Sequence, residues 1–160
     1  MNDREGLAAA PLWVVMQAGS LAAVFLLGAA AVRWNTRRGP LPILVGGTAV
    51  WAGVKLLKVP VGRERPSAYL DRVRVRGAEQ SGLGYPSGHA AVATLLAILA
   101  TRPGPSRRLA HGVAGMTGLA RIHVGAHLPL DVVGGLAIGT LAADGIDALL
   151  DARSNRASVR

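Results

Sequence analysis

The sequence contains no cysteine and few aromatic residues. Without cysteine, the chain has no disulfide framework, no thiolate metal site and no cysteine nucleophile. Aromatic residues make up 4% of the 160 residues, whereas 21 residues are glycine. This composition suits helices that pack closely through small side chains. Acidic residues are also scarce, because nine Asp and Glu stand against 18 Lys and Arg and give a formal net charge of +9.

Hydrophobic residues are abundant, at 51% of the chain with a mean hydropathy of +0.36. This is too apolar for an ordinary soluble domain and predicts one membrane domain over residues 1–160. A basic chain can bind nucleic acid, but here Lys and Arg lie between apolar segments. In that position they face anionic lipid headgroups or determine topology. We therefore expect a lipid bilayer, and no nucleic acid, as the partner.

Five apolar segments predict an all-α, polytopic membrane helical bundle with about five transmembrane helices. They cover residues 11–32, about 41–57, 89–100, 109 to about 127, and 129–150, between an N-terminal tail (1–10) and a basic C-terminal tail (152–160). The third segment is short for a complete crossing. The fifth carries Gly135 and Gly139 at a G-x-x-x-G spacing, which allows close packing of helices. Residues 59–87 form a long polar loop, a kind of segment that is often functional.

Five crossings place the long loop, the start of the third segment and the junction of the last two on one face of the membrane. Ionisable groups at membrane depth are costly, so a cluster of them indicates a functional site. The polar residues expected to converge on this face are Lys58, Arg63, Arg65, Ser87, His89, Arg121, His123, His127 and Asp131.

The stretch Pro86-Ser87-Gly88-His89 predicts a helix start that could bind an anion. Ser87 is a favourable N-cap, and the free backbone N–H groups after it lie at the positive end of the helix dipole. Gly88 has no side chain to keep an anion from these groups, and His89 can give or take a proton beside it. The alternative is a structural turn with a histidine at the membrane interface.

Two further elements suit a phosphate group. In KVPVGRERP, Lys58 offers a compact charge and Arg65 a forked donor that matches two phosphate oxygens. In RIHVGAHLPLD, Arg121 is followed by His127 and then by Asp131. The four-residue spacing of the last two lets the carboxylate hold one ring nitrogen protonated and leave the other free to attack.

In order and spacing, these elements resemble the signature of the type 2 phosphatidic acid phosphatase family of membrane lipid phosphatases, K-x6-RP, PSGH and SR-x5-H-x3-D. The resemblance runs from about residue 41 to 145. It implies a helical fold and hydrolysis of a lipid phosphomonoester or diphosphate through a phosphohistidine, without metal or cofactor. His127 would be the nucleophile, Asp131 its orienting partner, and His89 the acid that protonates the leaving alkoxide. The phosphate oxygens would be bound by Lys58, Arg65, Ser87, Gly88 and Arg121.

The chain departs from the family pattern in two respects. Ala120 stands where the family usually has serine, and five spans are expected where the membrane members commonly have six. Several other polar residues lie outside the motifs, and we expect most of them to be solvated or to face lipid headgroups: Lys55, Arg63, Arg72, Arg74, Arg76 and His123.

Two other classes of function remain open on the sequence. One is a phosphatase for soluble phosphate esters or a vanadate-dependent haloperoxidase-type relative, although such haloperoxidases are larger and soluble. The other is a non-enzymatic membrane scaffold, which the complete histidine–aspartate set disfavours. Candidate substrates are phosphatidic acid, phosphatidylglycerophosphate and polyprenyl phosphates or diphosphates. The resemblance places the site on the extracytoplasmic face of a bacterial-type plasma membrane. With the site on this face, Lys and Arg number nine on each side, and once the motif residues Lys58, Arg65 and Arg121 are set aside the opposite side has nine against six.

Overall fold

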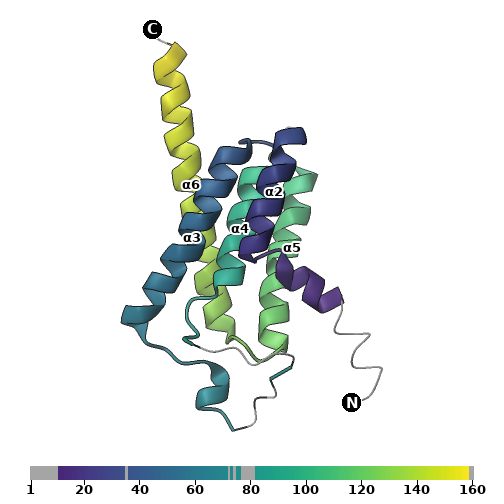
Figure 1. Ribbon diagram of the computed structural model, residues 1–160, viewed down its shortest axis with the longest axis vertical. Helices are drawn as coiled ribbons and strands as arrows, with labels where there is room; N and C mark the ends of the chain where they lie inside the picture. Colours follow the sequence, from purple (N-terminus) through teal and green to yellow (C-terminus); the bar gives the residue numbers. More distant parts are fainter. Residues whose placement is uncertain (1–10, 35, 72, 74, 77–81, 159–160) are drawn as a thin grey trace.

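The computed structural model describes residues 11–34, 36–71, 73, 75–76 and 82–158. The predicted N-terminal tail (1–10), Arg72 and Arg74 lie outside these residues. In the described part, secondary structure is helical, without strands, so the all-α prediction is confirmed. The elements are a short helix Pro11–Gln17, α2 (Leu21–Arg33), α3 (Pro40–Val61), the 3-10 turn η1 (Pro66–Ala68), α4 (Gly88–Ala100), α5 (Pro105–His123) and α6 (Pro129–Ser158) (Figure 1).

The short helix α4 lies at the centre of the bundle, with α2, α3, α5 and α6 around it (Figure 1). Every residue from Ala90 to Leu99 is buried. Leu95 and Leu99 pack with Ile43 of α3 and Val24 of α2 in the hydrophobic core. Because its neighbours surround it, α4 is apolar on all sides without needing the length of a helix exposed to lipid.

Length and composition identify two helices able to cross a membrane, Pro40–Ala68 and Pro129–Ser158, among the described residues. The bent pair Pro11–Gln17 and Leu21–Arg33 would be a third, whereas α4 has 13 residues. The expected number of crossings, about five, is therefore larger than the two or three spans that meet this criterion among the described residues. The outer faces carry many exposed apolar side chains, such as Leu26, Leu56 and Leu141, each 72% exposed, as a bilayer requires.

The first apolar segment, expected as one continuous span, is broken. Pro11–Gln17 and α2 meet at an angle of 70°. Ser20 begins α2 as its N-cap, since its side chain accepts a hydrogen bond from the backbone N–H of Ala23 at 3.2 Å. At the break, Gly19 lies so close to α4 that a Cβ would overlap the carbonyl oxygen of His89. The bend therefore brings the N-terminal segment against the start of α4.

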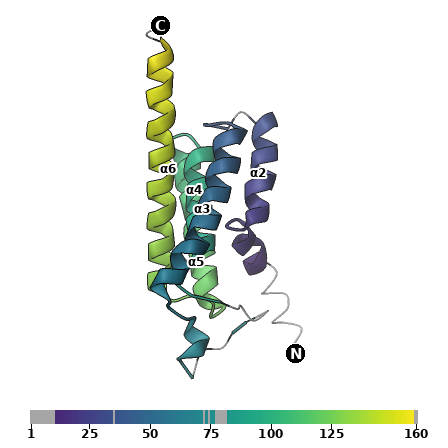
Figure 2. The same ribbon diagram turned by 60° about the vertical axis from the view of Figure 1, so that its left-hand side comes forward.

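Helix α6 is longer than the predicted fifth segment. It continues without interruption to Ser158, so most of the expected tail at 152–160 is helical. Figures 1 and 2 show the C-terminal part of α6 extending beyond the other helices, at the end of the bundle opposite the long loop.

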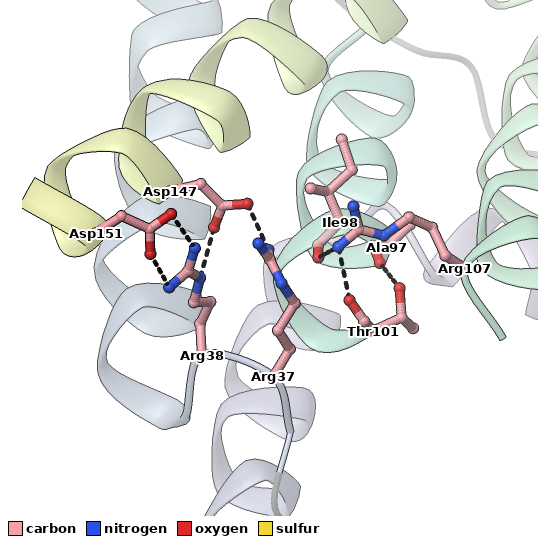
Figure 3. A network of polar contacts seen from close by, with 8 residues as sticks. All are labelled: Arg37, Arg38, Ala97, Ile98, Thr101, Arg107, Asp147 and Asp151. Atoms are coloured by element: carbon pink, nitrogen blue, oxygen red, sulfur yellow. Dashed lines mark hydrogen bonds and ion pairs between the residues drawn. The ribbon is translucent and has the colours of Figure 1, made fainter. Parts of the chain in front are cut away.

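Ion pairs tie α6 to the turn between α2 and α3 at this opposite end (Figure 3). Arg38 donates to Asp147 at 2.7 Å and to both carboxylate oxygens of Asp151 at 2.7 and 3.1 Å, while Arg37 also pairs with Asp147. Nearby, Arg107 donates to two carbonyl oxygens at the end of α4. The arginine-rich turns of this end are thus fixed to α4 and α6.

Helix α6 packs against the first turns of α4 through glycine. A Cβ at Gly135 would overlap the carbonyl oxygen of Ser87, and one at Gly139 would overlap that of Ala91. The G-x-x-x-G pair of the sequence therefore marks the tightest contact between the two helices. This contact also aligns the start of α4 with the start of α6.

The close contact predicts opposite effects for two glycine substitutions on α6. Gly135→Ala should lower the stability of the fold by about 1–3 kcal/mol, because the new methyl group overpacks the α4 contact. Gly145→Ala is the matched control, since a Cβ there meets nothing within 4 Å. The control should be neutral or stabilising by up to about 1 kcal/mol, the helix propensity gained over glycine. Thermal unfolding of both variants in detergent measures the difference, and equal stabilities would contradict the packing described.

Candidate active site

A cavity of about 310 Å³ lies where the start of α4, the end of α5 and the end of α3 meet. Six of the predicted site residues line it: Lys58, Arg65, Gly88, His89, Arg121 and His127. The remaining two are fully buried: Asp131 contacts His127, and Ser87 directly precedes Gly88. The convergence expected from the sequence is therefore present in the structure for these eight residues.

His127 and Asp131 form a buried pair at the junction of α5 and α6. The ring Nδ1 of His127 lies 3.3 Å from Oδ2 of Asp131, and the two side chains are 2% and 1% exposed. The same Oδ2 accepts the backbone N–H of Leu128 at 2.8 Å. Gly125 allows the reversal of the chain after α5 because its φ of 75° suits a residue without a Cβ. This turn leaves His127 outside both helices and Asp131 in the first turn of α6.

Burial lowers the pKa of His127 below its usual range, and the positive charges of Arg121, Arg65 and Lys58 act in the same direction. A neutral imidazole has one protonated nitrogen and one free lone pair. With Nδ1 protonated and donating to Asp131, the lone pair is on Nε2. An imidazole in this form has the unprotonated nitrogen that a nucleophilic histidine requires.

Ser87 caps α4, as its sequence position predicts. Its Oγ accepts from the backbone N–H of Ala90 at 3.5 Å, and its own N–H donates to the carbonyl oxygen of Asp131 at 2.8 Å. This second bond joins the start of α4 to the start of α6. The next two residues, Gly88 and His89, line the cavity at the positive end of the helix dipole.

Three cationic side chains reach the cavity from three different elements. Backbone carbonyl oxygens hold two of them: Lys58 Nζ donates to Leu83 at 2.7 Å, and Arg65 donates to Ala126 at 2.8 Å. Arg121 is 4% exposed, in the last turn of α5, with a nitrogen 3.9 Å from the sulfur of Met16. Cations fixed around a small cavity stabilise negative charge on a bound group without reorganisation.

Arg63 has a different position from the one expected. Instead of facing solvent or headgroups, it forms an ion pair with Oδ1 of Asp131. Its guanidinium also lies over the ring of Tyr85, 5.0 Å from the centroid. One indirect signal in the sequence could have indicated this ion pair. Asp131 uses one carboxylate oxygen to orient His127, and the second oxygen of a buried carboxylate also needs a partner.

Other polar residues divide between the cavity and the surface. Lys55 lines the cavity on α3, although it lies outside the motifs. His123 is exposed and not among the cavity-lining residues, and its carbonyl oxygen accepts from exposed Arg76 at 2.7 Å. Within the described ranges, no three His, Asp or Glu side chains are grouped to hold a metal ion.

The fold is similar to one solved structure in particular, described as the first transmembrane PAP2 type phosphatidylglycerolphosphate phosphatase from Bacillus subtilis. The two share 21% sequence identity with a TM-score of 0.69, over 89% of this chain and 76% of the other. No curated protein sequence matches this chain significantly.

The family model of the PAP2 superfamily matches residues 39–146. This range contains Lys58, Arg65, the Ser87–His89 stretch, Arg121, His127 and Asp131, so it includes all the elements on which the resemblance in the sequence rests. Because the match covers well over half of the sequence, the chain belongs to the PAP2 superfamily.

Proposed function

We propose that this protein is an integral-membrane lipid phosphatase that removes a phosphate group through a phosphohistidine on His127. The observation that carries the proposal is the His127–Asp131 pair, which borders a cavity that also contains His89. Three cations around the same cavity match the charge of a phosphate dianion: Lys58, Arg65 and Arg121.

In the first step, the lone pair of His127 Nε2 attacks phosphorus while the bond from phosphorus to the ester oxygen breaks. Asp131 accepts the Nδ1–H hydrogen bond and stabilises the positive charge that develops on the ring. His89 gives its proton to the leaving alkoxide. The cations stabilise the charge on the non-bridging oxygens of the transition state.

In the second step, water attacks phosphorus, the N–P bond breaks and inorganic phosphate leaves. His89, now neutral, takes the proton from water and returns to its starting state. The N–P bond that forms in the first step breaks in the second, as a bond to the water oxygen replaces it, and His89 recovers from water the proton that it gave to the alkoxide.

A lipid substrate fits the position of the cavity. Besides the charged residues, the lining includes Leu21 at the start of α2 and Trp51 and Val54 of α3. These apolar side chains belong to α2 and α3, and the outer faces of both helices carry exposed apolar residues. A lipid can place its phosphate among the cations while its chains leave toward the bilayer between these helices.

With the cavity-lining Lys58, Arg65 and Arg121 set aside, the distribution of Lys and Arg along the sequence supports an extracytoplasmic site. The turns of the opposite end carry Arg37, Arg38, Arg102, Arg107 and Arg108, and the end of α6 adds Arg153 and Arg156. Short connections rich in Lys and Arg remain in the cytoplasm, and neighbouring acidic residues have little influence on this rule. The site at the other end of the bundle then faces outward, in a bacterial-type plasma membrane.

Hydrolysis should not depend on a divalent metal, because the cavity cations already supply the positive charge that a metal would provide. Phosphate release from phosphatidic acid, phosphatidylglycerophosphate and a polyprenyl phosphate in detergent micelles should be unchanged by EDTA. Loss of activity with EDTA and its recovery on adding a divalent metal would contradict the mechanism.

Alanine substitution of the two histidines should have different effects on activity. The effect at His89 should depend on the leaving group of the substrate. His127→Ala should abolish turnover and the phosphoenzyme, since the nucleophile is gone. His89→Ala should slow lipid hydrolysis about hundred- to ten-thousand-fold, as expected for a lost general acid. With p-nitrophenyl phosphate the loss should be much smaller, because nitrophenolate needs no proton to leave. Equal losses of His89→Ala on both esters would show that His89 binds phosphate instead.

Arg63 should act as a positioning residue through Asp131. Arg63→Met should lower kcat by up to about hundredfold with little change in KM, because the His127 ring loses its fixed orientation. Arg63→Lys should recover part of this loss. Arg102→Met, an exposed arginine at the opposite end, is the matched control and should keep full activity. A rise in KM alone, or an equal effect of both methionine variants, would exclude this role.

A further inference from the structure

The ring of Tyr85 connects the long loop with α6. Tyr85 directly precedes Pro86, in the part of the loop that leads into α4. On α6, Gly134 leaves space for the ring, because a Cβ at this position would lie 2.7 Å from Cε2 and from Oη of Tyr85. The guanidinium carbon of Arg63 lies over the same ring, 5.0 Å from its centroid. Tyr85 therefore contacts both α6 and the arginine that pairs with Asp131.

Backbone contacts hold this part of the loop beside Arg63. The N–H of Gly84 donates to the carbonyl oxygen of Arg63 at 2.7 Å. Gly84 is buried, and a Cβ there would lie 2.7 Å from the carbonyl oxygen of Glu64. Tyr85 thus follows a residue that is packed against the backbone of Arg63 and Glu64. This packing keeps the Tyr85 ring within reach of the Arg63 side chain.

The direction of the Arg63 side chain depends on the ring. Arg63 pairs with Oδ1 of Asp131 through one terminal nitrogen, Nη2, and its Nε has no hydrogen-bond partner among the described residues. A guanidinium that meets a carboxylate through a single nitrogen can still turn about that contact, unlike one in a bidentate pair. Planar guanidinium groups stack on aromatic faces. The ring of Tyr85 therefore restricts this rotation.

The contacts continue from Arg63 to the proposed nucleophile. Oδ2 of Asp131 lies 3.3 Å from Nδ1 of His127, while Oδ1 of the same carboxylate pairs with Arg63. If Arg63 turned away, a buried carboxylate oxygen would lose its partner, which is costly enough to change the orientation of Asp131. Tyr85 is not among the described residues that line the cavity. Its side chain would thus act on the reaction without touching the phosphate.

We propose that Tyr85, seated on Gly134, is a positioning residue that keeps Arg63 against Asp131 and thereby holds the His127 ring in line for attack. The inference rests on the proposed phosphohistidine mechanism and adds a residue that lies outside the three sequence motifs. The aromatic ring carries this role rather than the phenol hydroxyl, because Arg63 lies over the ring.

The first test separates the ring from the hydroxyl. Tyr85→Leu should lower kcat about two- to thirtyfold with little change in KM, the range to which one cation–π contact corresponds. Tyr85→Phe keeps the ring and should stay within about twofold of the unmodified protein. Tyr69→Leu is the matched control, since Tyr69 is an exposed tyrosine of the same loop, and it should keep full activity.

Phosphate release from phosphatidic acid, phosphatidylglycerophosphate and a polyprenyl phosphate in detergent micelles measures these effects. Full activity of Tyr85→Leu, a rise in KM alone, or equal losses in Tyr85→Leu and Tyr85→Phe would exclude the role of the ring.

A double-mutant cycle shows whether Tyr85 acts through Arg63. In the Arg63→Met background, Tyr85→Leu should lower kcat by less than about twofold, because the ring no longer has a guanidinium to hold. If the two losses multiply instead, Tyr85 acts independently of Arg63 and the proposal is wrong.

Gly134→Ala tests the same contact from α6 without changing Tyr85. The new methyl group displaces the ring, so kcat should fall by a similar factor. Gly145→Ala should keep full activity, because a Cβ there meets nothing within 4 Å. This pair decides the question if Tyr85→Leu does not fold, and equal activity of the two alanine variants would overturn the proposal.

A spectroscopic measurement separates this inference from the proposed function, because it needs no turnover. Nitrogen-15 NMR of labelled histidine side chains in detergent micelles, with the His127 signals identified by their absence in His127→Ala, reports which ring nitrogen carries the proton. The unmodified protein and Tyr85→Phe should show His127 protonated on Nδ1 alone, whereas Tyr85→Leu and Arg63→Met should show a mixture of both tautomers. An unchanged His127 signal in Tyr85→Leu would refute the positioning role. Absence of hydrolysis in the unmodified protein would refute the phosphatase function and leave this signal unaffected.

Discussion

The site depends on backbone contacts that glycine allows around the first turn of α4. Gly135 lets α6 approach Ser87, and Gly19 lets the bend before α2 approach His89. Both contacts are too close for any side chain. Since His89 is on α4 and His127 is on the turn before α6, the distance between the two rings depends on this packing. The Ser87 N–H bond to the Asp131 carbonyl, at 2.8 Å, adds a polar link at the same point.

The cations around the cavity lower the stability of the fold because they repel one another, and nearby carbonyl groups reduce this effect. Lys58, Arg65 and Arg121 line one small cavity, where their like charges repel one another. Carbonyl oxygens of Leu83 and Ala126 hold two of these cations in position. In the function that we propose, a bound phosphate dianion relieves the repulsion that remains. Binding of a negative charge removes this repulsion. The stability that the repulsion costs the empty protein is then recovered as affinity for the substrate and for the transition state.

Much of the site followed from the sequence because its elements carry local signals. The N-cap at Ser87 and the spacing from His127 to Asp131 are each set within one or two helical turns, and the structure agrees with both. Because successive helices were expected to cross the membrane in alternating directions, these elements were predicted to lie on one face. The bend at Gly19 was hidden by an uninterrupted apolar stretch, although Ser20 before an apolar run is a possible N-cap signal.

The positions of Arg63 and Lys55 could not be predicted in the same way. Arg63 is two residues from Arg65 in one loop, and only the tertiary fold decides which of them turns toward Asp131 and which toward the cavity. Lys55 has the pattern of a lysine that extends to the membrane surface. Its place in the cavity depends on α2 and α4 packing beside α3. Local periodicity carries no information about such contacts between elements.

The position of Asp131 resolves a conflict between orienting a histidine and attracting an anion. An ionised carboxylate in the cavity would compete with phosphate for the cations and repel it. Asp131 instead lies behind His127, where its Oδ2 faces the ring and the Leu128 N–H, and its Oδ1 pairs with Arg63. Because it is neutralised by an arginine outside the cavity-lining set, it can orient the ring while the potential in the cavity stays positive. The additional arginine thus makes a buried carboxylate compatible with the anionic substrate that we propose.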